Sequence, residues 1–508
     1  MRFGMLKKMT AALSVAALTL AGCGGASSGS AAANKELAAD AIKKANYGNG
    51  ISCHDPQIIL ADGTYYMTGS HMVLAKSSDM DAWEYIANGS AKNFISNLYS
   101  GDLPAFSYVG KNEEGGYSVW AANIWYNETM GKYCMYFCTS SSYIKSALAL
   151  AVSDVPEGPY TYVDTFLCSG FSTSEAEKTN LADVLGPDAD TSRYYKYGGY
   201  DNTKWPNCID PAIYTDDDGK IWMVYGSWSG GLFTLEIDPE TGLPIHPEAD
   251  EESGVDPYFG YHLIGGGHHA CEGPFIFHNE ENGYYYLFVS CGSLTRTGGY
   301  QMRLYRSESP TGPFVDASGK TWNNEEDYFN YGLKIMGNYD LPSLETAYMA
   351  PGGQSVFVGA DGNTYLVYHQ RFDNGSEYHE PRVHRLYLTE DDWYVAAPFE
   401  TGSESSKEGG YTAADLAGGF YILDHELDVS DVIHEGKACT MRDGAVSGEY
   451  EGTYEMTDGT DILHLTIGGV TYTGKIINMT DEAGNETLSF MAVGSNNHTL
   501  WGVKYLAS

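Results

Sequence analysis

A turn-and-strand pattern that recurs five times is the feature of this sequence that most limits its possible folds. Each copy has a glycine in a tight turn followed by aromatic and β-branched residues, as in Gly131-Lys-Tyr-Cys-Met-Tyr-Phe. The copies are 68, 88, 64 and 79 positions apart, enough for a small antiparallel sheet with variable loops. Such an array predicts an all-β chain that contains a five-bladed β-propeller. The turn glycines are Gly63, Gly131, Gly219, Gly283 and Gly362.

One position in each copy is expected to face the axis of the propeller, because the first strand of each blade lines that axis. The candidate position lies 8 to 11 residues before each turn glycine, and three of its five residues are carboxylates. We therefore expect one site that contains all three acids. The five residues are Asp55, Asn123, Asp210, Glu272 and Gln354.

The composition excludes some partners and permits others. A net charge of −38 at pH 7 would repel the phosphates of nucleic acids and of anionic membranes. The 41 tyrosines and 9 tryptophans could stack on the apolar faces of sugar rings, so a neutral polysaccharide is a compatible partner. Composition alone favours a simpler alternative, in which the acidity only keeps an exported protein soluble.

Residues 1–22 are predicted to be a lipoprotein signal peptide, with a positive start and a short apolar run. The sequence Leu20-Ala21-Gly22-Cys23 resembles the lipobox of bacterial lipoproteins. This resemblance implies cleavage before Cys23, acylation of its thiol and anchoring at the outer face of the cell membrane. No other membrane contact is expected. An ordinary signal peptide followed by a chance cysteine is the alternative.

The remaining chain divides into four predicted parts. Residues 23–46 are interpreted as a flexible tether, 47–400 as the propeller, 401–417 as a linker and 418–508 as a small β-barrel-like domain. The second domain could pack on the propeller or bind sugar. The polar stretch 171–206 is predicted to be a long loop near the binding face. The cysteines other than Cys23 lack Cys-x-x-Cys spacing, so few or no disulfides and no zinc site are expected.

Three short segments hold the acids, each with a proline one or two residues after the acid: His54-Asp55-Pro56, Ile209-Asp210-Pro211 and Glu272-Gly273-Pro274. In this order they resemble glycoside hydrolase family 43. Further segments are similar to its endo-arabinanase branch, and the C-terminal part resembles the extra barrel of its two-domain members. These segments include Tyr225-Gly-Ser-Trp-Ser-Gly-Gly-Leu232, Gly298-Gly-Tyr300, Met349-Ala-Pro-Gly-Gly-Gln-Ser355, Tyr368-His-Gln-Arg-Phe372 and Leu500-Trp-Gly-Val-Lys504.

The resemblance implies that the protein hydrolyses α-1,5-linked L-arabinan and arabino-oligosaccharides with inversion. Asp55 would be the general base that activates water, and Glu272 the general acid that protonates the leaving oxygen. Asp210 would orient Glu272 and raise its pKa. Inversion needs one ionised and one protonated carboxyl group, roughly 6.5–9.5 Å apart. The alternative, that each acid only caps a strand or binds turn amides, does not explain three acids at one phase.

The family also implies secondary site residues. Trp120 would stack on an arabinose ring, and Asn207 and Ser227 would bond sugar hydroxyls. His369 would help to hold one metal ion, with Ca²⁺ expected, largely through water. Core roles for Trp120 and His369 are the alternatives. The segments Trp120-Ala-Ala-Asn123 and Gly352-Gly-Gln-Ser355 depart from the usual family pattern, which leaves the polar network at the axis open.

The sequence thus predicts a monomeric, endo-acting arabinan hydrolase. One rival is another activity of the same family, exo-α-L-arabinofuranosidase or β-xylosidase, and groove shape would separate the two. The other rival is a non-catalytic arabinan-binding lipoprotein. The complete set Asp55, Asp210 and Glu272 argues against a binder, since capture alone does not need it.

Overall fold

The structure is a computed structural model that describes residues 36–46, 48–88, 95, 102–250, 253–323, 327–400 and 403–507. The predicted signal peptide and Cys23 lie outside these residues. Within them, no helix has the length and apolar character needed to cross a membrane. The eight described cysteines are all free and buried.

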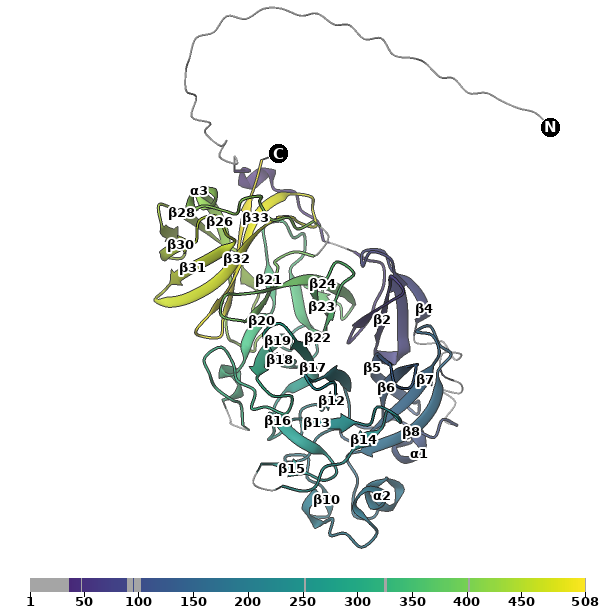
Figure 1. Ribbon diagram of the computed structural model, residues 1–508. Helices are drawn as coiled ribbons and strands as arrows, with labels where there is room; N and C mark the ends of the chain where they lie inside the picture. The colour runs from purple at the N-terminus through teal and green to yellow at the C-terminus, as the bar shows by residue number, and fades with distance from the viewer. Residues whose placement is uncertain are drawn as a thin grey trace, which may run out of the picture. The chain divides into compact units, whose positions relative to one another are not determined.

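Five blades, each built on four antiparallel strands, confirm the predicted propeller (Figure 1). Extra short strands widen the third blade, β14 (Pro244–Ile245) and β15 (Val255–Asp256), and the fifth, β21 (Tyr339–Asp340). The four-stranded cores are β1 (Gln57–Ala61), β2 (Thr64–Gly69), β3 (Val73–Ser77) and β4 (Glu84–Asn88); β5 (Ser118–Asn127), β6 (Lys132–Ser140), β7 (Ser146–Ser153) and β8 (Thr161–Cys168); β11 (Ala212–Thr215), β12 (Ile221–Tyr225), β13 (Leu232–Ile237) and β16 (Gly260–Ile264); β17 (Cys271–Asn279), β18 (Tyr284–Cys291), β19 (Gln301–Ser307) and β20 (Leu333–Met336); and β22 (Tyr348–Val358), β23 (Thr364–Phe372), β24 (His379–Leu388) and β25 (Tyr394–Ala396).

The first strand of each blade lies at the axis. Each of these strands contacts its counterpart in the next blade, and β22 of the last blade contacts β1 of the first. The predicted turn glycines lie where the first strand turns into the second; Gly362, for example, has a φ of 77° between β22 and β23. Only a residue that tolerates a left-handed backbone fits such a turn without strain. This explains why the repeat could be read from its glycines.

The C-terminal strands form a closed barrel, as the short alternating strands predicted. Its interior is filled by apolar side chains that include Phe420, Leu463 and Phe490. Outside the barrel, Trp501 is fully buried and its indole Nε1 donates to the Ala396 carbonyl, 2.8 Å away, at the end of the propeller. The strands in order of pairing are β26 (Gly418–His425), β28 (Lys437–Arg442), β29 (Ala445–Gly448), β30 (Gly452–Met456), β31 (Ile462–Ile467), β32 (Val470–Thr480), β33 (Glu486–Gly494) and β34 (Thr499–Tyr505), with β27 (His434–Glu435) pairing β21.

Helix is scarce, as the glycine- and tyrosine-rich composition predicted. The stretch 171–206 was expected to be irregular, but it carries short helices and a two-stranded hairpin, and its Phe171 and Tyr194 are fully buried. The short helices and the hairpin are η1 (Ala39–Ala41), η2 (Ser70–Met72), α1 (Phe106–Val109), η3 (Ala176–Lys178), α2 (Leu181–Leu185), η4 (Ser192–Tyr194), η5 (Tyr328–Asn330), α3 (Ala413–Leu416), β9 (Tyr195–Lys196) and β10 (Gly199–Tyr200).

The described part of the predicted tether is packed, which corrects the expectation of a flexible segment. Glu36 forms a β-bridge with Leu506 at the end of the barrel. Farther along, Asn46 exchanges two hydrogen bonds of 2.7 Å with the backbone of Thr346 in the propeller. The composition of this segment gives no sign of these partners, because they lie far away in the sequence.

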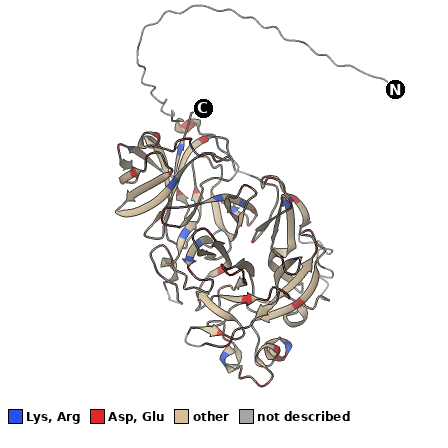
Figure 2. Cartoon of the chain, viewed as in Figure 1, with Lys and Arg blue, Asp and Glu red and all other residues tan. Residues whose placement is uncertain are grey.

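Acidic residues are spread over the propeller and the barrel (Figure 2). Examples are Glu84 on β4, Asp164 on β8, Glu236 on β13 and Glu455 on β30. The negative charge is therefore distributed over the fold and is not confined to one segment.

Candidate active site

In each blade a residue in the left-handed backbone region lies inside the axial strand or two residues before it. These residues occupy equivalent places, since each one and the two residues after it line a small axial hollow of about 40 Å³. Three of the five lie at bulges in β5, β17 and β22, where the ladder register shifts. Their φ angles are 54° for Asp55, 37° for Ala121, 55° for Asp210, 57° for Gly273 and 58° for Gly353.

This ring corrects the predicted phase of the acids. Asp55 and Asp210 are equivalent, as predicted, but Glu272 lies one residue before the equivalent position, which Gly273 fills. A bulge adds a residue and re-aims its neighbours, so a count back from the turn glycine slips by one or two positions. Asn123 and Gln354 are displaced for the same reason. Asn123 lies two positions after Ala121 in the sequence and Gln354 one position after Gly353, and both line the hollow.

The three acids nevertheless line one cleft of about 510 Å³. All three are half-buried, so their carboxyl groups are reachable while much of their surroundings is protein. Besides them the cleft is lined by Ser52, His54, Ser70, His71, Val73, Asn88, Trp120, Ile209, Leu294, Tyr300, Arg371 and His379.

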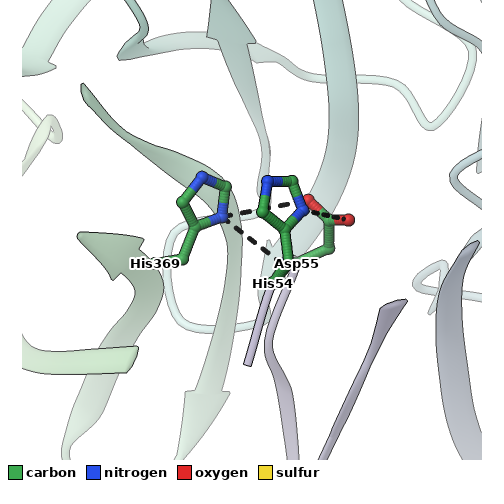
Figure 3. A group of neighbouring side chains, drawn as sticks. All are labelled: His54, Asp55 and His369. Atoms are coloured by element: carbon green, nitrogen blue, oxygen red, sulfur yellow. Dashed lines mark hydrogen bonds and ion pairs between the residues drawn. The ribbon is translucent and has the colours of Figure 1, made fainter. Parts of the chain in front are cut away.

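Asp55 is held as a carboxylate by two neighbours. His54 Nδ1 lies 2.8 Å from Asp55 Oδ2 (Figure 3). Ser70 Oγ donates to the same oxygen at 2.5 Å. Burial acts to raise the pKa of Asp55, but the charge and hydrogen bond of His54 and the hydrogen bond of Ser70 outweigh it and lower the pKa. Asp55 is thus ionised at neutral pH, the state that a general base needs.

Glu272 has the opposite tendency. Burial and the negative charge of Asp55 raise its pKa, although hydrogen bonds from Tyr300 and Ser227 oppose the shift. Tyr300 Oη lies 2.8 Å from Glu272 Oε1, while Ser227 Oγ and Trp228 Nε1 donate to Oε2 at 3.1 and 3.0 Å. A carboxyl group held in one orientation, with a raised pKa, can deliver a proton to a bound substrate.

Asp210 Oδ2 accepts a hydrogen bond of 3.1 Å from the backbone amide of Gly273. Burial raises the pKa of Asp210 well above its usual range, and the charges of Asp55 and Glu272 add to this. Because repulsion between two carboxyl groups is mutual, ionising either Asp210 or Glu272 disfavours ionisation of the other. Asp210 is therefore placed both to orient the backbone next to Glu272 and to influence its proton.

Of the three residues predicted to contact sugar, Trp120 lines the cleft, whereas Ser227 and Asn207 are buried and do not line it. Trp120 is half-buried and lines the cleft, where its ring can meet substrate. Ser227 is buried and bonds Glu272. Asn207 is also buried; its Nδ2 donates to the Tyr143 carbonyl at 2.5 Å and its Oδ1 accepts from Ser169 Oγ at 3.3 Å. Ser227 and Asn207 thus bond protein groups that the sequence could not identify.

His369 is fully buried beneath Asp55, its ring stacked on His54 with a centroid separation of 3.9 Å (Figure 3). The Asp55 amide donates to His369 Nδ1 at 3.4 Å, and His369 Nε2 is buried without a protein partner. Burial lowers the pKa of His369 well below its usual range, so the ring is neutral.

The ligand atoms of His54, Asp55 and His369 lie within 4.8 Å of one another. Two imidazoles and one carboxylate do not supply the six to eight oxygens that Ca²⁺ requires. The unpartnered His369 Nε2 fits a cation only if water provides most of the ligands. This is the kind of site that the sequence resemblance implied.

Sequence reasoning missed four contributors to the site. His54 and Ser70 hold Asp55, and Tyr300 and Trp228 hold Glu272. His54 is the immediate neighbour of Asp55, and Trp228 and Tyr300 stand in motifs that the sequence comparison had singled out. Ser70 reaches Asp55 from the connection between β2 and β3 of the same blade, Tyr300 reaches Glu272 from the β18–β19 loop, and Trp228 reaches it from the neighbouring third blade. No local signal assigned these contacts.

Comparison with known proteins gives two family matches along the chain. Residues 171–394 match the model of glycosyl hydrolases family 43, and residues 398–502 match a C-terminal lipocalin-like domain. The first match covers the blades that hold Asp210 and Glu272, and the second covers the barrel.

Individual relatives match over most of the length. An extracellular endo-α-(1→5)-L-arabinanase 2 from Bacillus subtilis is 33% identical over 474 residues, 89% of this chain and 93% of the relative. An extracellular endo-α-(1→5)-L-arabinanase from Thermotoga petrophila is 33% identical over the same shares. A crystal structure of the Thermotoga petrophila endo-1,5-α-L-arabinanase in complex with TRIS superposes with a TM-score of 0.76 at 32% identity, covering 89% of this chain and 98% of that one.

Proposed function

Because this chain belongs to glycosyl hydrolases family 43, we propose that it is an endo-α-1,5-L-arabinanase that cleaves arabinan inside the chain. Identity of 33% to two endo-acting relatives, along 89% of the chain, supports endo action over the other activities of the family. The observation that carries a catalytic function is the pair Asp55 and Glu272. They share one cleft, and their surroundings shift their pKa values in opposite directions.

The opposed pKa shifts support an inverting mechanism. Asp55 takes a proton from a water molecule while the oxygen of that water forms a bond to the anomeric carbon of the arabinose unit. The glycosidic bond breaks on the opposite face, and Glu272 gives its proton to the departing oxygen. One ionised and one protonated carboxyl group are needed at the start, and the surroundings of these two residues favour that combination. Trp120 would stack on the arabinose unit being transferred.

We assign Asp210 an indirect role. Its bond to the Gly273 amide fixes the backbone beside Glu272, and its charge, when present, would keep the proton on Glu272. These two effects are separable, because replacing Asp210 with Asn alters the charge while an amide oxygen can still accept from Gly273.

A hydrated cation against His369 Nε2, with Ca²⁺ the first to test, also belongs to the proposal. Such an ion would supply positive charge beneath Asp55 and so favour its ionised state. The support is that His369 Nε2 is buried without a protein partner and that the ring is neutral, so the ring adds no positive charge that would repel a cation.

The protein is exported, since both relatives described above are extracellular. We further propose that it stays at the outer face of the cell membrane through lipid on Cys23. The support for the anchor is the lipobox-like Leu20-Ala21-Gly22-Cys23.

The deciding experiment is incubation with linear, debranched arabinan and sizing of the earliest products. Mixed oligosaccharides are expected from endo action, whereas arabinose alone would mean exo action. Binding without any product would support the non-catalytic alternative. The anomeric form of the first product, observed by NMR, should be inverted relative to the substrate.

A further inference from the structure

A row of three rings leads away from Glu272. Trp228 Nε1 donates to Glu272 Oε2 at 3.0 Å, and the Trp228 ring lies 5.6 Å from that of His268. The His268 ring in turn lies 5.6 Å from that of Tyr143, in an edge-to-face arrangement. The rings come from three separate loops: β12 to β13, β16 to β17 and β6 to β7. None of them lines the cleft described above, and the row meets the site at Glu272.

The row is most open at its far end. Trp228 and His268 are half-buried, while Tyr143 is 62% exposed. Burial, with the neighbouring His269, lowers the pKa of His268, so its ring is uncharged at neutral pH. An open row of uncharged rings suits the apolar faces of successive sugar units and would not select for a charged ligand.

The exposed tyrosine is held by a fixed backbone. Asn207 Nδ2 donates to the Tyr143 carbonyl, and Ser169 Oγ donates to the Ile144 carbonyl at 2.9 Å. The Ser141 amide donates to the Lys145 carbonyl at 3.1 Å and so closes the loop around them. A large ring on a rigid loop loses little conformational entropy when it binds. Through its bond to the Tyr143 carbonyl, Asn207 supports the position of this ring, a role that requires no contact with the sugar.

The other two rings stand on strained backbone. Trp228, Ser229 and His268 have φ angles of 45°, 39° and 65°, values that residues other than glycine rarely adopt. Hydrogen bonds hold the strained segments, from the Trp228 amide to the Cys271 carbonyl at 2.7 Å and from the His268 amide to the Ser229 carbonyl at 2.8 Å. Such strain persists where surrounding contacts enforce it, and it is concentrated at ligand sites.

We propose that Trp228, His268 and Tyr143 form the leaving-group side of the substrate groove, where they stack successive arabinose units of the departing chain. The inference rests on the proposed function and deepens it. The direction follows from chemistry: the departing oxygen must lie at Glu272, and the row begins at the Glu272 carboxylate. Asp55, on the opposite side of the sugar, is held by His54 and Ser70 and has no contact with the row.

The test is the position at which arabinohexaose with a labelled reducing end is cut. The leaving part carries the label, so weaker stacking there favours binding modes with fewer units on that side. With Tyr143→Ala we expect the main cut to move at least one bond toward the label and kcat/KM on the hexaose to fall about tenfold. Tyr143→Phe keeps the ring and should keep the wild-type pattern.

Tyr126 offers a matched control. It is 45% exposed, but it lies near the far end of β5 from the axial hollow and contacts Tyr133. Tyr126→Ala should leave the cut unchanged. If Tyr143→Ala leaves the pattern of the wild type, or moves the cut away from the label, the inference is overturned while the proposed function stands. If the wild-type protein does not cut the hexaose at all, the proposed function fails and the inference with it.

Discussion

Gly353 offers the sharpest test of how the cleft is built. It holds the left-handed position of the fifth blade, with a φ of 58°. A Cβ added there would lie 2.3 Å from Asp55 Oδ1 and 2.8 Å from His369 Nδ1. Heavy atoms do not approach a Cβ more closely than 3.0 Å, so the Asp55 carboxylate would have to move by at least the 0.7 Å that separates 2.3 from 3.0 Å.

That movement cannot be absorbed without cost, because His54 and Ser70 hold the other carboxylate oxygen at 2.8 and 2.5 Å. A misplacement of about 1 Å in a catalytic group costs roughly 100-fold in rate. We therefore expect Gly353→Ala to lower kcat/KM on linear arabinan about 100-fold. The left-handed backbone adds about 1–2 kcal/mol of destabilisation for any residue with a Cβ.

Gly362→Ala separates these two effects. Gly362 has a φ of 77°, but no heavy atom lies within 4 Å of an added Cβ. It should show a comparable loss in thermal stability with kcat/KM near the wild-type value. Initial rates of reducing-end release and thermal unfolding, measured on both variants, check the argument. If folded Gly353→Ala retains kcat/KM within about twofold of Gly362→Ala, the proposed contact with Asp55 does not control catalysis.

Four further outcomes are expected. Asp55→Asn and Glu272→Gln should each lower turnover by ~10²–10⁴-fold or more in protein that unfolds at the wild-type temperature; near-normal turnover in either would remove that residue from catalysis. Asp210 and Glu272 repel each other when both are ionised, and Asn cannot ionise, so Asp210→Asn should let Glu272 lose its proton at lower pH and move the alkaline limb of kcat/KM toward acid. An unmoved limb with a lower maximum would instead mean that Asp210 acts only through Gly273. Elemental analysis should find Ca²⁺ or a similar hard cation in protein purified without added metal, and His369→Ala should reduce both the metal content and calcium binding measured by calorimetry; metal-free, fully active protein would argue against the site. Cys23→Ser should move the protein from the membrane fraction to the soluble fraction, and retention in the membrane would contradict a lipid anchor.

The repeat, the barrel and the meeting of the three acids could be predicted because each has a local signal. Turn glycines mark the hairpins, and a proline after Asp55 and Asp210 marks the strand entrances. The exact phase could not be predicted. Bulges in β5, β17 and β22 insert residues that leave no clear mark in the sequence, so Glu272, Asn123 and Gln354 were placed one or two positions from their true equivalents.

Residue roles were harder to predict than residue positions. Asn207 and Ser227 were expected to bond sugar, which stays a prediction; the protein contacts that they make, to the Tyr143 loop and to Glu272, were not predicted. An amide or hydroxyl is able to bond either substrate or protein, and only its neighbours decide which. The packed segment at Asn46 illustrates the same limit, because its partner Thr346 lies 300 positions away in the sequence.

The sequence by itself determined the architecture and the chemical inventory of this protein. Periodic glycines and apolar strands specify five blades and a barrel through short-range backbone preferences, and Asp55, Asp210 and Glu272 supply the acids. Only the tertiary structure decided which acid holds a proton. That state depends on burial, on the charge that Asp55 presents to Glu272 from another blade, and on hydrogen-bond partners: His54 and Ser70 beside Asp55, and Tyr300, Ser227 and Trp228 around Glu272. Electrostatic energies follow distance in space and not separation along the chain, so they exist only once the propeller has closed.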